Sequence, residues 1–246
     1  MSKLIDLIGR LGQQSAQPIG FGALTGRVEA APTMALIGSA SASRVVDDLT
    51  AVGRDNVDAV VFDSDDTDLH IEIRRRGKDG AFSDLIWGVL CRYMDNKGLE
   101  EMVEAGCDFL LAELDSTPAA VVSHPDVALI LGLEEPVDRR TASALRSLGV
   151  AGSWNLSDTG WTGTFEDLIE FRKIGESTGG VMLIHGWGGM SVAMLTSLRD
   201  AGVDAIITSL RDHDRVQELA QSIRDLPPRS RRESPRIQAA APRGGE

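Results

Sequence analysis

The chain has 246 residues, of which 42% are hydrophobic and 25% are charged, and its formal net charge is −12 at neutral pH. This composition supports a folded domain with a sizeable core and excludes a disordered or fibrous chain. Because nucleic acid is bound by a basic surface, the acidic charge argues against a general DNA- or RNA-binding protein. We therefore expect a partner that is a small molecule.

The sequence also argues against a membrane protein and against an oxidising compartment. No run of about 18 apolar residues occurs, and Lys3, Asp6 and Arg10 interrupt the apolar positions near the start, so neither a membrane span nor a secretory signal fits. Cys91 and Cys107 are too few for a disulfide framework or a zinc cluster. Both lie in apolar stretches, where reduced thiols pack as small hydrophobes. A cytoplasmic location is the expectation.

The first part of the chain, residues 1–33, precedes the regular pattern described below. A run of apolar residues marks one face of a short helix there: Leu4, Ile5, Leu7, Ile8 and Leu11. Residues 18–24 are typical of a strand or a buried loop. We expect this N-terminal extension to pack on the domain that follows.

Eight short apolar runs rich in β-branched residues recur after this extension. They lie at residues 34–40, 59–63, 85–91, 109–114, 127–133, 150–156, 181–186 and 205–210. Their starts are about 24 residues apart on average, which leaves room for one helix and two short loops in each interval. The runs are nearly continuous in apolar residues, as expected for parallel strands that helices cover.

The joints between helices and strands repeat as well. An aspartate directly precedes five of the runs: Asp58, Asp84, Asp108, Asp126 and Asp204. Gly106 and Gly202 stand where helices should end, a position that glycine favours. Eight such units within residues 34–226 predict an α/β fold, a single (β/α)8 or TIM barrel. A doubly wound open sheet is the alternative, but the Gly-rich dinucleotide turn expected after its first strand is missing.

The two ends of the chain fall outside the repeat. The N-terminal extension should plug the end of the barrel where the strands begin. Residues 227–246 are rich in Pro, Arg, Gly and Ala and show no apolar period. Such a segment buries too little apolar surface to offset its ordering entropy, so a flexible tail is predicted.

Reactive groups of such barrels lie where strands end, and the seventh run ends in a suggestive segment. His185 is followed by Gly186, Trp187, Gly188 and Gly189, and then by Ser191 before a helix. Closely spaced glycines let backbone N–H groups approach an anion, and the helix adds its positive end. The pattern predicts a site for the phosphate of a substrate or of FMN, with Ser209 contributing from the end of the last run.

The stretch from Gly180 to Leu210 resembles the phosphate-gripping end of flavin-binding barrels such as nitronate monooxygenases, and of the tryptophan and thiamine biosynthesis barrels. This resemblance implies phosphate or FMN binding by the same glycines. One position departs from the pattern, because those families usually end the eighth strand with a Gly-Ser pair, whereas Thr208 precedes Ser209 here. Side-chain hydroxyls would then replace part of the backbone contact.

Two residues are the candidates for catalysis. His185 alone among the four histidines ends a core strand beside the glycines, so it is the candidate general acid or base. Glu113, which ends the fourth run, is the second candidate. The alternative for His185 is a structural histidine whose ring nitrogen binds a neighbouring carboxylate. Cys91 ends the third run, but no activating group is near it in the sequence, and inert packing is favoured.

Aromatic residues are scarce, at 4% of the chain, and this scarcity makes their positions informative. Trp154, Trp161 and Trp187 lie near strand ends or in the loops that follow. They predict a pocket for a flat or apolar ligand. The alternative is that they cover the barrel core or form a contact in a homo-oligomer.

Carboxylates that end or follow three runs offer a different chemistry. Asp63, Glu113 and Glu134 would supply oxygen ligands suited to Mg²⁺ or Mn²⁺, and enolase-type and phosphoenolpyruvate-mutase-type barrels are similar in this single respect. Our main expectation is a small-molecule enzyme that binds a phosphate group or FMN. The alternatives are a metal-dependent lyase or isomerase and a non-catalytic barrel that serves as a binding or assembly module.

Overall fold

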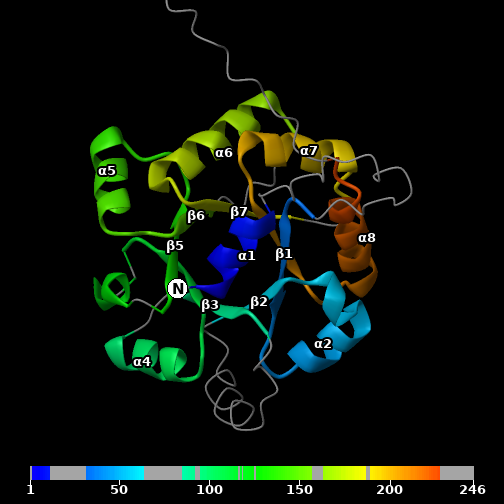
Figure 1. Cartoon of the computed structure of the whole chain (residues 1–246), viewed down its shortest axis with the longest axis horizontal. Helices are drawn as coiled ribbons and strands as arrows, with labels where there is room; N and C mark the ends of the chain where they lie inside the picture. Colours follow the sequence, from blue (N-terminus) through cyan, green and yellow to red (C-terminus); the bar gives the residue numbers. More distant parts are fainter. Residues whose placement is uncertain are drawn as a thin grey trace, which may run out of the picture.

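The computed structural model describes residues 2–11, 32–63, 85–91, 95–115, 117, 119–124, 126–156, 163–186 and 189–227. Eight parallel strands close into a barrel in their order along the chain, and β8 pairs with β1 (Figure 1). The strands are β1 (Ala35–Ala40), β2 (Ala59–Asp63), β3 (Trp87–Cys91), β4 (Phe109–Glu113), β5 (Ala128–Leu133), β6 (Gly152–Asn155), β7 (Val181–His185) and β8 (Ala205–Ser209). Each lies within one of the eight apolar runs, so the predicted TIM barrel is confirmed.

Helices surround the ring of strands (Figure 1). They are α2 (Val45–Val52), α4 (Asn96–Glu104), α5 (Arg139–Ser147), α6 (Phe165–Thr178), α7 (Val192–Ala201) and α8 (His213–Arg224), with short 3-10 helices η1 (Arg54–Asn56) and η2 (Ala119–Ser123). The interval after β4 is the shortest, and the 3-10 helix η2 stands there. Gly202 ends α7 with a left-handed φ of 105°, as predicted for a helix C-cap. No helix of the described residues is long and apolar enough to cross a membrane.

Side chains alternate along each strand and so build two separate cores. Those that face outward, such as Leu36 and Phe62, pack against the surrounding helices. Those that face inward, such as Ile37, Val61 and Leu111, fill the barrel itself. The barrel is thus a packed interior.

The repeated aspartates have a structural role that the sequence pattern did not reveal. Asp58 Oδ2 accepts a hydrogen bond from the backbone N–H of Leu36 at 2.8 Å, and Asp204 Oδ2 accepts one from Met182 N–H at 3.1 Å. Each carboxylate therefore ties the start of its own strand to the start of the preceding one. Burial raises the pKa of Asp58, while the Leu36 N–H and the charge of Arg224 act in the opposite direction.

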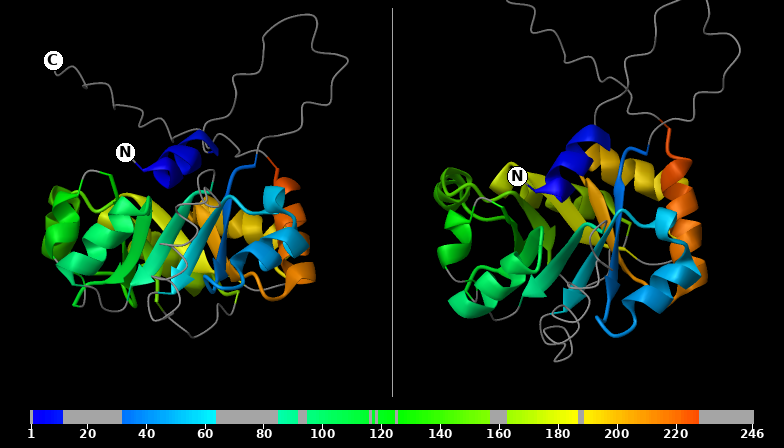
Figure 2. Two further views of the ribbon diagram at one scale, coloured as in Figure 1. Left: turned by 90° about the horizontal axis from the view of Figure 1, so that it is seen from below. Right: turned by 60° about the horizontal axis from the view of Figure 1, so that its bottom comes forward.

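Helix α1 (Lys3–Leu11) lies across the end of the barrel where the strands begin (Figure 2). Leu4 and Ile8 are buried among the inward-facing side chains. The carboxylate of Asp108, just before β4, accepts hydrogen bonds from Ser2 Oγ at 2.7 Å and from the N–H groups of Lys3 and Leu4 at 2.7 and 2.9 Å. The side chain of Asp108 thus caps α1 from the barrel. The segment 18–24, predicted to be a strand or buried loop, lies outside the described residues.

A buried arginine links the first and last units of the barrel. Arg199, in α7, is 3% exposed, and its guanidinium donates to Asp200 Oδ1 at 3.0 and 3.1 Å and to Thr33 Oγ1 at 3.4 Å. It also donates to the carbonyl of Pro227, which follows α8. Thr33 precedes β1, so one side chain links the residues that lead into the first strand and out of the last helix. Residues 228–246, the rest of the predicted tail, lie outside the described residues.

Candidate active site

Polar side chains face inward at the end of the barrel where the strands finish. They continue the inward alternation of the barrel core by one further layer, and they are Ser39, Asp63, Glu113, His185 and Ser209. The last four were candidates from the sequence. His185 and Ser209 are exposed, and the other three are half-buried. A ring of hydroxyl, carboxylate and imidazole groups therefore surrounds this opening, which we name the mouth. TIM-barrel enzymes carry their active sites at this end.

Trp154 forms part of the floor beneath this ring. It faces inward from β6, is 4% exposed, and packs among the interior side chains. Its ring meets that of His185 edge to face, with centroids 5.4 Å apart and an interplanar angle of 72°. Trp154 and His185, both candidate site residues from the sequence, are thus in direct contact.

The indole nitrogen of Trp154 points toward a gap in the side chains of β5. Gly132 pairs with Trp154 across the β5–β6 ladder and with Glu113 across the β4–β5 ladder. A Cβ at Gly132 would lie 2.9 Å from Trp154 Nε1 and 2.7 Å from Leu156 Cδ1. Glycine is therefore required here, because the indole and the Leu156 side chain share the space above it. Nε1 is buried and has no hydrogen-bond partner among the described residues.

The segment between β7 and α7 contains the predicted anion-binding glycines. The N–H of Gly186 donates to the carbonyl of Ile207 at 2.8 Å, so this amide extends the β7–β8 ladder. Gly189 has a φ of 89°, and a Cβ built there would meet nothing within 4 Å. Ser191 caps α7, since its Oγ accepts a hydrogen bond from Met194 N–H at 3.3 Å. Gly188 and Trp187 lie outside the described residues, as does Trp161.

The backbone N–H groups that directly follow β8 already have hydrogen-bond acceptors. Leu210 N–H donates to the carbonyl of Ser39 at 2.9 Å, and Arg211 N–H is 3.4 Å from Ser209 Oγ. A phosphate at this side of the mouth would therefore be held by the first turn of α7, whose N–H groups at Val192 and Ala193 lie outside the helical ladder, and by the Ser209 hydroxyl.

The three carboxylates of the metal hypothesis occupy different settings. Asp63 and Glu113 are half-buried and belong to the inward ring, whereas Glu134 lies just beyond β5 and is exposed. No group of three or more His, Cys, Asp or Glu that could hold a metal ion exists among the residues that the structure describes. The metal site stays a prediction.

Burial raises the pKa of Cys107 far above its usual range, and Cys91 is buried as well.

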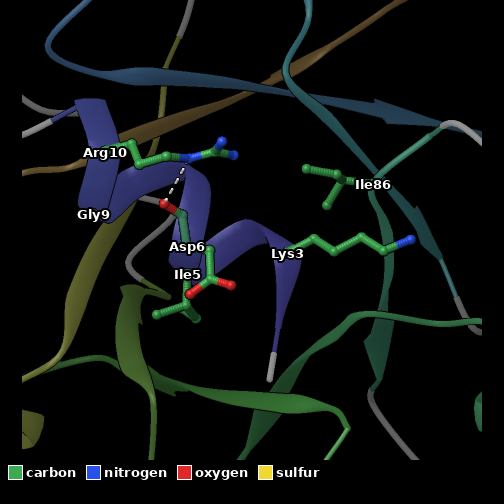
Figure 3. A pocket seen from close by; sticks show the side chains of 6 residues that line it. All are labelled: Lys3, Ile5, Asp6, Gly9, Arg10 and Ile86. Atoms are coloured by element: carbon green, nitrogen blue, oxygen red, sulfur yellow. Dashed lines mark hydrogen bonds between the residues drawn. The ribbon is translucent and has the colours of Figure 1, made fainter.

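A second opening lies at the opposite end of the barrel. A hollow of about 620 Å³ borders α1 and is lined by Lys3, Ile5, Asp6, Gly9, Arg10 and Ile86 (Figure 3). Arg10 Nε donates to the backbone carbonyl of Asp6 at 3.3 Å, one turn earlier in the same helix. This end is the face of TIM barrels that serves stability, and its lining lacks the convergent acid–base groups of the mouth.

Two residues of the mouth escaped the sequence reasoning. Gly132 and Leu156 both lie in predicted strands, where they are typical of a buried core. Only the register, which sets Gly132 beside Trp154, shows that they shape the space around the indole nitrogen. A glycine inside an apolar strand pattern was the one available signal, because it often marks a close approach.

No protein-family model and no curated protein matches this chain. Solved structures do. KGPDC from Streptococcus mutans has 14% sequence identity and a TM-score of 0.60, over 78% of this chain and 98% of that one. The 3-keto-L-gulonate-6-phosphate decarboxylase from Vibrio cholerae has 15% identity and a TM-score of 0.58, over 79% and 99%. A 3-hexulose-6-phosphate synthase has 17% identity and a TM-score of 0.54, over 78% and 98%.

These likenesses agree with the geometry described above. The chain is an α/β protein of the TIM-barrel class, and the structures similar to it are TIM-barrel enzymes. At such low identity the likeness concerns the fold, and it assigns the chain to no specific family. The function of the barrel depends on the residues at its mouth and not on its fold.

Proposed function

We propose that this chain is an enzyme that binds a phosphate-bearing small molecule at the mouth of the barrel and uses His185 as a general acid or base. The observation that carries the proposal is the ring of inward polar side chains, which lies at the same end of the barrel as the N-terminus of α7. Acid–base groups and a helix N-terminus suited to an anion thus share one opening.

The phosphate would lie against the first turn of α7. Ser191 ends the preceding loop and holds this turn in place, and the two free N–H groups beyond it point toward the mouth side of the helix. The open space beside Gly189 leaves room for the anion to approach the backbone. The names of similar structures support this ligand class, because two of them are enzymes of sugar 6-phosphates and a third is a complex of KGPDC with a small molecule.

Acid–base chemistry would centre on His185 and Glu113. The edge-to-face contact with Trp154 orients the imidazole at the end of β7, with the ring exposed to the mouth. Glu113 reaches the same ring of side chains from β4. A substrate held by its phosphate near β7 and β8 would extend across the mouth toward β4. It would then lie between His185 on β7 and Glu113 on β4, which would remove and return protons.

Binding is tested by placing a negative charge at the proposed phosphate site without removing the helix cap. Ser191→Asp keeps a capping oxygen but adds a charge that repels phosphate. We expect the rise in melting temperature caused by three- to six-carbon sugar and polyol phosphates to disappear, with at least about tenfold weaker binding. Ser191→Thr keeps the cap and stays neutral, so it should behave like the parent.

The matched control changes another helix cap at the same end of the barrel. Thr164 caps α6 through the backbone N–H of Asp167 at 3.3 Å, so Thr164→Asp adds the same charge at a helix that the proposal does not use. Its response to sugar phosphates should equal that of the parent. Equal responses of the Ser191→Asp protein and the parent would refute the phosphate site.

The chemical step is tested by an assay that needs no knowledge of the product. Carbonyl-containing sugar phosphates are incubated with the protein in D₂O, and the loss of C–H signals beside the carbonyl is followed by proton NMR. His185→Asn keeps hydrogen-bonding capacity but cannot titrate near neutral pH, so exchange should fall about 10²- to 10⁴-fold while binding persists. Unchanged exchange in the variant would remove His185 from the proposal.

The other predictions from the sequence have separate signatures. Bound FMN would colour the purified protein yellow. A Mg²⁺ or Mn²⁺ site would raise the melting temperature of the parent, and Glu113→Gln or Glu134→Gln would remove that rise. A binding or assembly module, including a homo-oligomer, would show neither response.

A further inference from the structure

The buried indole N–H of Trp154 is the strongest unexplained polar group in the described part of the chain. The residue is 4% exposed, and its Nε1 has no hydrogen-bond partner among the described residues. A buried donor without a partner costs about 1–3 kcal/mol, so native proteins satisfy nearly all such groups. The indole nitrogen is only a donor. Whatever satisfies it must bring an acceptor atom into the barrel.

The space beside this nitrogen lies above Gly132 and is bordered by the side chain of Leu156. Gly132 contributes no side chain, and the room above it is shared by Trp154 Nε1 and Leu156. Leu156 is half-buried at the end of β6 and so borders the open mouth, while Trp154 lies one layer deeper. A rotation of the Leu156 side chain would connect the indole nitrogen to the mouth.

The polar groups around this space limit the kind of acceptor. Glu113 pairs with Gly132 and belongs to the inward ring, as does Asp63. The Glu113 carboxylate disfavours an anionic group beside Gly132, whereas a hydroxyl can donate to that carboxylate and accept from the indole N–H. The phosphate of the same molecule would lie at the neighbouring part of the mouth, where β7 leads into α7.

We infer that Trp154 determines substrate specificity by donating its indole N–H to a hydroxyl or carbonyl oxygen of a phosphorylated polyhydroxy compound, in the space that Leu156 now covers above Gly132. The inference rests on the proposed function and adds to it the chemical class of the non-phosphate end of the substrate. Trp154 thus has two functions, since its ring edge also positions His185.

The central variant is Trp154→Phe, which removes the donor and keeps an aromatic ring beneath His185. Trp87→Phe is the matched control, because Trp87 is equally buried, at 2% exposure, but packs in the outer core between strands and helices. The probes are inorganic phosphate, D-ribulose and D-ribulose 5-phosphate, together with the sugar and polyol phosphates used above.

In the parent, sugar phosphates should raise the melting temperature more than inorganic phosphate does, whereas D-ribulose alone should have little effect. In Trp154→Phe we expect sugar phosphates to bind about 3- to 10-fold more weakly, the effect of one lost hydrogen bond, with the response to inorganic phosphate unchanged. Trp87→Phe should respond to every probe like the parent, even where it melts at a lower temperature.

A second measurement examines the parent protein directly. With ¹⁵N-labelled indoles, the Nε1–H signal of Trp154 is assigned by its loss in Trp154→Phe. It should shift on addition of the sugar phosphate and stay in place with inorganic phosphate. Leu156→Ala should uncover the nitrogen and speed its hydrogen exchange with water.

The outcomes separate the inference from the function on which it rests. The specificity role is overturned if sugar phosphates bind Trp154→Phe as tightly as the parent, or if the Trp154 Nε1–H signal does not shift when they are added. The phosphate site stands in either case. If no phosphorylated probe stabilises the parent, or if Ser191→Asp responds fully, the proposed function fails and the inference fails with it.

Discussion

Replacement of Leu4 by alanine tests whether α1 seals the barrel. The Leu4 side chain is 0% exposed and packs among the inward-facing side chains. Removing three carbon atoms forfeits about 2.4 kcal/mol of transfer free energy, at about 0.8 kcal/mol for each carbon. The cavity that remains raises the cost to roughly 2.7–5 kcal/mol. For a domain of this size the melting temperature should fall by about 5–20 °C.

Thermal and urea denaturation of matched variants provide the assay. Leu148→Ala is the control, because Leu148 is 52% exposed and its loss should change the free energy of unfolding by no more than about 0.5 kcal/mol. A Leu4→Ala protein as stable as Leu148→Ala would refute the packing of α1 inside the barrel. Asp108→Ala removes the cap of the same helix. Because both changes weaken one docked element, their combined cost should be smaller than the sum.

Further predictions follow from polar groups and close contacts elsewhere. Burial raises the pKa of Asp58 above 3.8, so its carboxyl destabilises the fold as pH rises through the range above about 4, and Asp58→Asn should remove that slope in urea titrations. Hydrogen bonds, first from the Thr141 hydroxyl, lower the pKa of Asp138 below 3.8, so its contribution is lost as pH falls below about 4, and Asp138→Asn should flatten the opposite slope. Arg199→Met should cost about 1–3 kcal/mol by leaving its acceptors unpaired, measured by thermal melting. Gly180→Ala should melt at a lower temperature, because its Cβ would lie 1.9 Å from a backbone oxygen, whereas Gly9→Ala, with nothing within 4 Å, should gain about 0.5–1 kcal/mol.

The strands were predictable because their outward side chains are buried against helices. Buried parallel strands read as continuous apolar runs, and residues 59–63 and 109–113 show this directly in β2 and β4. Glycines at helix ends, such as Gly202, marked the boundaries. The segment that forms η2 was harder to predict, since a short apolar stretch fits a 3-10 or an α-helix equally well.

The sequence predicted which polar residues end the strands, but it did not predict that they form a ring around the mouth. A residue that ends a strand is easily found, which is why His185, Glu113 and Asp63 were named correctly as strand ends. Whether such a residue faces inward depends on whether it is an even number of residues from an inward-facing position of the same strand. The pairing of Gly132 with Trp154 depends in turn on the register between β5 and β6. Register arises from contacts between distant segments, so local patterns carry little information about it.

The bond network of Arg199 has a consequence for how this chain can be rearranged. One guanidinium holds Thr33, which leads into β1, and Pro227, which leaves α8, and β1 is itself paired with β8. The first and last units of the barrel are therefore neighbours, just as any two consecutive units are. A circular permutant that joins these two points and opens the chain in a loop between a helix and the next strand would retain all eight strand pairings, with the mouth intact.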